Sequence, residues 1–181
     1  IHEEAETFQN VAHIELLYAM YTANFDYVSE LRKDIEKGLE KYADKMVSAR
    51  KIIIHYNFFV VLFMQEDFAA AQIYLDKILQ FSRKEVRKDI VRGTFLLEII
   101  IRIENQIPVQ QLLDNVPRIL RRSKLWDEDT KEIIRHFKRY IDSPVFERQA
   151  ALKPFVEWLH QNKQAHDSTP AIGEIRIWAK S

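Results

Sequence analysis

The scarcity of turn-forming residues constrains this chain more than any other feature of its sequence. Only three glycines and five prolines occur among 181 residues. A sheet protein with many tight turns needs more of both, because glycine supplies positive φ angles and proline presets the φ of common turns. The glycines, Gly38, Gly93 and Gly173, also lie too far apart to form a glycine-rich phosphate loop. The chain is therefore expected to consist of long elements with few turns.

Apolar side chains recur at intervals of three and four residues along most of the chain, which is typical of helices. Ile14, Leu17, Tyr18 and Tyr21 share one face of a first helix in this way. The stretch 52–64 is apolar on nearly all sides, which predicts a central, buried helix. No stretch of convincing length alternates like a strand. We therefore predict an all-α protein with helices over residues 3–23, 26–43, 45–64, 67–81, 84–105, 108–122, 127–140, 143–162 and 169–178.

The predicted helices pair with a regular spacing. The second, fourth and sixth helices each begin beside an apolar turn residue, and these residues (Phe25, Phe68 and Ile107) are 43 and 39 positions apart. A helix pair that recurs about every 40 residues is typical of an α-solenoid. We predict a right-handed α-solenoid of antiparallel helix pairs over residues 1–122, capped by the helices of residues 123–181. These parts would form one continuous domain, which we expect to be a piece of a longer chain.

One of these pairs carries a family pattern. Its first helix has aromatic and apolar residues at characteristic intervals, its turn is Gln-Glu-Asp-Phe, and its second helix brings a small residue to the close helix crossing. These positions are His55, Phe58, Phe59 and Leu62, then residues 65–68, then Ala71 and Leu75. The arrangement resembles a tetratricopeptide repeat, with histidine at the family's tryptophan position and glutamate at its turn glycine. The resemblance extends over residues 10–122, and in overall style the chain is similar to helical-repeat proteins of bacteria.

Composition excludes several classes of site. The chain has no cysteine, which excludes disulfides, thiolate metal sites and cysteine nucleophiles. Its first residues do not read as a secretory signal, and its longest apolar stretch, 52–64, is too short to span a bilayer. A cytoplasmic location without membrane contact is therefore the default expectation.

The histidines and carboxylates of the sequence do not indicate a catalytic or metal site. Glu157 and His160, and likewise Glu132 and His136, are spaced to share a helix face, but neither pair has the further ligands that a metal site needs. His55 lies within the apolar run, so we expect a histidine buried in the core rather than a functional group. We expect no enzymatic activity, no metal and no cofactor.

The resemblance implies a binding role. In helix-pair solenoids the first helices line a concave groove that holds an extended or helical peptide. We therefore predict a non-catalytic scaffold or adaptor that binds a protein or peptide partner in such a groove. An alternative, left open here, is that these residues are core covered by the first helix or the C-terminal tail. The predicted groove residues are Tyr56, Asn57, Val60, Phe63, Met64, Phe95, Ile99 and Arg102.

Charge supplies an alternative function. The formal net charge is zero, but residues 1–80 carry 8 basic and 13 acidic side chains, whereas residues 81–181 carry 19 and 14. Basic runs over 83–92 and 118–139 could form a stripe that binds nucleic acid or an acidic ligand, as in a regulatory domain. Interspersed carboxylates make this the weaker hypothesis. Its candidate residues are Arg87, Lys88, Arg92, Arg121 and Arg122.

Overall fold

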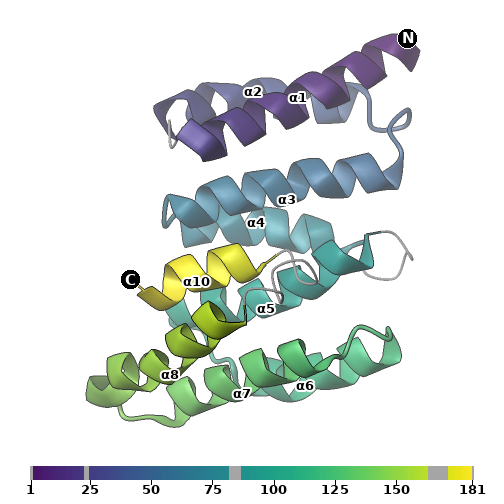
Figure 1. Cartoon of the computed structure of the whole chain (residues 1–181). Helices are drawn as coiled ribbons and strands as arrows, with labels where there is room; N and C mark the ends of the chain where they lie inside the picture. The colour runs from purple at the N-terminus through teal and green to yellow at the C-terminus, as the bar shows by residue number, and fades with distance from the viewer. Residues whose placement is uncertain (1, 23–24, 82–86, 163–170, 181) are drawn as a thin grey trace. The chain divides into compact units, whose positions relative to one another are not determined.

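The structure, a computed structural model, describes residues 2–22, 25–81, 87–162 and 171–180. Over these ranges the chain forms nine α-helices, one short 3₁₀ helix and no strand, which confirms the prediction of an all-α protein (Figure 1). Each α-helix begins and ends within a few residues of its predicted bounds. The elements are α1 (His2–Thr22), α2 (Phe25–Lys41), α3 (Ser48–Met64), α4 (Phe68–Leu79), α5 (Lys88–Glu104), α6 (Gln110–Arg122), α7 (Glu128–Asp142), η1 (Val145–Glu147), α8 (Arg148–Gln161) and α10 (Ile172–Lys180).

The chain divides into two compact units, Ile1–Arg87 and Lys88–Ser181. In each unit, helices that follow one another along the chain pack together, as helix pairs with short connections do. The boundary predicted after residue 122 lies inside the second unit, between α6 and α7.

The first unit is built around α3. This helix packs against α4 and α1, and α1 also packs against α2 (Figure 1). Phe58 of α3 stacks on Tyr74 of α4, with ring centroids 4.9 Å apart, and both side chains are buried. Ala71, the small residue of the repeat pattern, is completely buried on α4. The side chain of Asp67 accepts a hydrogen bond from the Ala70 amide at 3.0 Å and so caps the start of α4.

The second unit is built around α5, which packs against α6 and α10. Twelve consecutive residues of this helix, 90–101, are buried, so α5 is enclosed more completely than α3, the helix expected to be central. Gly93 permits a close approach, since a Cβ there would lie 2.9 Å from the Ala171 Cβ. Phe137 of α7 meets Phe155 of α8 edge to face, at a centroid distance of 5.7 Å.

Three helices end in the same kind of turn. After α3, α5 and α6, a residue with φ near +60° turns the backbone, and the next amide donates to the carbonyl five residues earlier. This is the Schellman ending, which glycine usually provides. Glu66, Gln106 and Lys124 take the left-handed position here, with φ of 60°, 57° and 57°. Glu66, the residue at the family's turn glycine, therefore has the conformation that a glycine would have.

Candidate functional site

The first helix has one buried apolar face, made mostly of small residues, and one exposed apolar face made of large residues. Ala12 and Ala19 are 1% and 0% exposed, and Leu16 between them is also buried. On the opposite face, large apolar side chains are exposed and spaced at alternating intervals of three and four residues. We call these four residues the α1 stripe: Val11 (47% exposed), Ile14 (64%), Tyr18 (57%) and Tyr21 (88%).

The inward face of α1 lies against α3 and is held there by a polar contact. His13 of α1 and Asn57 of α3 bond through Nδ1 and Nδ2 at 2.9 Å. Burial lowers the pKa of His13, and the charge of Arg50 lowers it further, so the imidazole is neutral near pH 7. In that form Nδ1 can accept the hydrogen that the Asn57 amide donates. This bond, with the alanine packing, fixes which face of α1 points outward.

Acidic groups of α1 itself, and aromatic rings from α1, from α2 and from the residue after α2, border the α1 stripe. Tyr27 donates its hydroxyl to Glu15 Oε1 at 3.2 Å. Phe8 lies against Tyr42, with ring centroids 5.4 Å apart. Glu3, Glu4, Thr7, Phe8, Val11 and Tyr42 line an open pocket of about 650 Å³ at the N-terminal end of the stripe.

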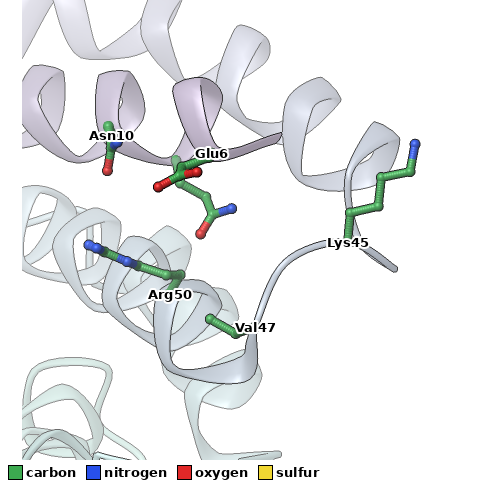
Figure 2. Close-up of a pocket in the computed structure, with 6 residues that line it drawn as sticks. Glu6, Asn10, Lys45, Val47 and Arg50 are labelled. Atoms are coloured by element: carbon green, nitrogen blue, oxygen red, sulfur yellow. The ribbon is translucent and has the colours of Figure 1, made fainter. Parts of the chain in front are cut away.

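A second, more polar pocket of about 230 Å³ lies between α1 and the start of α3. Figure 2 shows Glu6 and Asn10 extending from α1 toward the side of Arg50, whereas Lys45 points away. Its walls combine an acid, two cationic side chains and amides in an exposed setting. Such a mixed lining selects no particular ligand.

The predicted groove residues on α3 are mostly covered. Asn57, Val60 and Phe63 are buried, while Tyr56 and Met64 are half-buried. Asn57 is the residue bonded to His13, so α1 occupies the side of α3 to which this amide points. These residues lie together on one helix as predicted.

The predicted groove residues on α5 belong to the second unit. Phe95 and Ile99 are buried, and Arg102 is half-buried. The Arg102 guanidinium donates through Nη2 and Nε to Glu98 Oε1, at 2.8 and 3.1 Å. The groove formed by α3 and α5 together remains a prediction.

The basic candidates do not share one environment. Arg92 is buried and donates through Nη1 to Asp127. Arg121 and Arg122 are exposed in the last turn of α6, where cations favour the negative end of the helix dipole. The guanidinium of Arg121 lies 4.8 Å from the centre of the Trp126 ring. Arg87 and Lys88 are half-buried, and Arg83 and Lys84 of the same run lie outside the described residues.

Of the histidines considered for catalysis or metal binding, His55 and His136 pack against aromatic rings, whereas His160 is exposed. His55 lies beside Tyr74 and Phe81, and burial lowers its pKa to about 4, with help from the charges of Lys77 and Lys51. His136 stacks on Phe155 at 4.7 Å. Its Nε2 lies 3.3 Å from Glu132 Oε1. Within the described ranges no three histidine or carboxylate side chains gather as a metal site would require.

Three members of the α1 stripe, Ile14, Tyr18 and Tyr21, were expected to share one helix face, but no role was predicted for them. A signal was present: Ala5, Ala12, Leu16 and Ala19 form a second apolar face on the opposite side of the same helix. When one helix carries two apolar faces, the smaller side chains suit close packing against a neighbour, and the larger are left outside. Val11 was not singled out.

Comparison with known proteins identifies no family for this chain. The chain matches no family model, and no curated protein or solved structure matches it either. Over the residues that the structure describes, no helix is both long enough and apolar enough to cross a membrane.

Proposed function

We propose that this chain is a non-catalytic protein–protein interaction module whose docking surface is the α1 stripe. The observation that carries the proposal is the orientation of α1, with Ala12, Leu16 and Ala19 buried and the four residues of the α1 stripe in solvent. Full burial of one such large apolar side chain is worth about 1.5–3 kcal/mol. A contiguous exposed row of them therefore marks a surface that a partner covers.

The proposal has a finer form, in which the chain is a tetratricopeptide-like solenoid and the partner lies in a concave groove. The sequential packing of helices and the shared turns after α3, α5 and α6 support it. Burial of Asn57, Val60, Phe63, Phe95 and Ile99 weighs against a groove lined by their side chains. We therefore place the docking surface on α1.

The alternative, a regulatory domain that binds nucleic acid or an acidic ligand, is the weaker proposal. Arg92 is already paired with Asp127, and Lys138 approaches Asp114 at 3.4 Å. Binding through the remaining exposed arginines would weaken steeply as salt is raised, because phosphate contacts release counterions. Binding to an apolar stripe would change little over the same salt series.

Site-specific photo-crosslinking tests the proposed function. Benzoylphenylalanine is placed at position 18 or, as a matched control, at position 146, because Tyr18 and Phe146 are both exposed aromatics. In cells that express the chain, we expect a discrete protein adduct from position 18 and none from position 146. No adduct from position 18, or the same adducts from both positions, would contradict the proposal.

A further inference from the structure

The spacing of the α1 stripe determines the shape of what can cover it. Intervals of four and three residues, as between Ile14, Tyr18 and Tyr21, are those of a coiled-coil seam, where side chains of one helix insert between those of another. From Val11 to Tyr21 the stripe spans about 15 Å, or about three helical turns. A straight, narrow apolar row of this length matches an α-helix better than a broad surface.

The charge of α1 determines what kind of helix can lie on the α1 stripe. Its sequence contains four glutamates, Glu3, Glu4, Glu6 and Glu15, and neither lysine nor arginine. A second copy of this helix would bring the same carboxylates and no cation to neutralise them. A helix with lysine or arginine beside its apolar row would instead place opposite charges along both borders.

A cation of α2 already lies beside Tyr42, one of the residues that line the pocket at the N-terminal end of the stripe. Lys41 Nζ lies 4.8 Å from the centre of the Tyr42 ring, and the carboxylate of Glu4 acts on the same ammonium group. The pocket places the Phe8 and Tyr42 rings beside the carboxylates of Glu3 and Glu4. Rings and carboxylates together suit a long cationic side chain, whose apolar stem packs while its head stays near the acids.

We infer that the partner is an amphipathic α-helix that docks along α1, with apolar residues at three- and four-residue intervals on the α1 stripe and lysine or arginine residues facing Glu3, Glu4 and Glu15. This inference rests on the proposed function. The basic residues of the partner concentrate at the end that lies over Glu3 and Glu4, where the carboxylates of α1 are densest.

A displayed peptide library is the probe. Each member is a helical peptide of about five turns, with seam positions varied among Leu, Ile, Ala and Ser and flanking positions varied among Lys, Glu, Gln and Ser. Selection uses the whole 181-residue chain, and binders that also bind the Ile14→Ser/Tyr18→Ser variant are removed. Thermal denaturation of that variant checks that it is folded.

We expect the selected peptides to combine an apolar seam with lysine flanks. The best of them, measured by fluorescence anisotropy, should bind the double variant about tenfold more weakly than the wild-type chain. Its Lys→Glu version should lose about as much, and Glu3→Gln/Glu4→Gln in the chain should weaken binding severalfold.

Other outcomes overturn the inference in recognisable ways. Selected peptides that are acidic, or whose binding ignores the α1 stripe, contradict the basic helix, while a position-18 crosslink would leave the proposed function standing. A dimer in sedimentation that dissociates in the Ile14→Ser/Tyr18→Ser variant would make a second copy the occupant. Absence of both stripe-dependent peptides and position-18 adducts would overturn the inference and the proposed function together.

Discussion

The helices α1 and α7 are both surface helices, yet they treat their apolar residues in opposite ways. On α7, Ile133, Ile134 and Phe137 are buried, and the outer face carries charged side chains that pair with one another. Arg135 bonds to Glu132 there, and Lys131 lies 3.1 Å from Glu128. On α1 the four large apolar residues of the α1 stripe are exposed. The outer face of α7 is suited to water, whereas that of α1 is suited to a partner.

The largest expected difference comes from truncating one aromatic residue on each helix. Phe137→Ala should lower the free energy of unfolding by about 3–5 kcal/mol, because it removes a buried ring that contacts Phe155 and Trp178. Tyr18→Ala should change it by about 0.5 kcal/mol or less, because that ring is already solvated. Denaturant unfolding of both variants measures this. Equal losses of unfolding free energy in the two variants would show that the Tyr18 ring is packed. The contrast between α1 and α7 would then be wrong.

The units also differ in how they hold a histidine, which predicts a pH effect. Burial lowers the pKa of His55 to about 4, so between about pH 6.5 and 4 the unfolded chain binds a proton that the folded chain does not. Stability therefore falls as pH falls through this window, by about 3 kcal/mol in total. His55→Phe should remove this dependence.

His136 provides the matched control for that effect. Burial also lowers its pKa, but the neighbouring Glu132 carboxylate opposes the shift. We therefore expect His136→Phe to reduce the pH dependence of the free energy of unfolding less than His55→Phe does. Unfolding measured at a series of pH values gives the comparison. A His55→Phe curve as steep as that of the wild type would contradict the buried, neutral imidazole.

A smaller effect is expected from introducing leucine on either face of α1. Ala19→Leu should cost about 1–3 kcal/mol, because the added atoms meet a closely packed interior. Ile14→Leu, which keeps the side-chain volume on the exposed face, should be nearly neutral. Thermal denaturation of the two proteins gives the comparison. If Ala19→Leu is tolerated as well as Ile14→Leu, the alanine face is not packed.

The smallest effects concern two helix caps, one in each unit. Asp67→Ala should cost about 1 kcal/mol, because it leaves the first amides of α4 without their side-chain acceptor. Asp127→Ala should cost about 1 kcal/mol more, since it also removes the partner of the buried Arg92. Urea unfolding measures the loss of unfolding free energy in each variant. Equal losses in the two would show that the contact of Asp127 with Arg92 contributes nothing.

The same cap at Asp127 gives a pH signature at acid values. Burial raises the pKa of Asp127, but the hydrogen bonds from Thr130 and the charge of Arg92 outweigh it and hold the pKa below its ordinary value. The carboxylate therefore contributes stability above about pH 4, and that contribution is lost as pH falls further. Asp127→Asn, which keeps an oxygen acceptor for the Thr130 amide, should lack this loss.

The helices were predictable because helical periodicity is a local property. In the part of the chain that the structure describes, nine α-helices follow from three- and four-residue spacing, and only their ends differ from the prediction by a few residues. The left-handed residues Glu66, Gln106 and Lys124 were not predictable, because nothing in their side chains requires a positive φ. All three are exposed, and the conformation accompanies the backbone hydrogen bond that closes each turn.

The orientation of α1 depends on tertiary contacts, and in its own sequence only the sizes of the side chains on its two faces indicate it. Both faces of the helix are apolar, so periodicity alone does not say which is inside. The bond between His13 and Asn57, 44 positions apart, favours the alanine face. For Asn57 this is the alternative stated from the sequence, that the predicted groove residues are covered by the first helix: a residue suited to bind a peptide is equally suited to bind the neighbouring helix.

The absence of cysteine from the chain permits a direct measurement of which way α1 faces. Single thiols are introduced at neighbouring positions by Tyr18→Cys and Ala19→Cys, and their rates of reaction with a maleimide are compared in the native and denatured proteins. The Tyr18→Cys thiol should react natively about as fast as when denatured, and the Ala19→Cys thiol at least about tenfold more slowly. A protected thiol in Tyr18→Cys together with a reactive one in Ala19→Cys would show that α1 is turned the other way, and the docking surface would not exist.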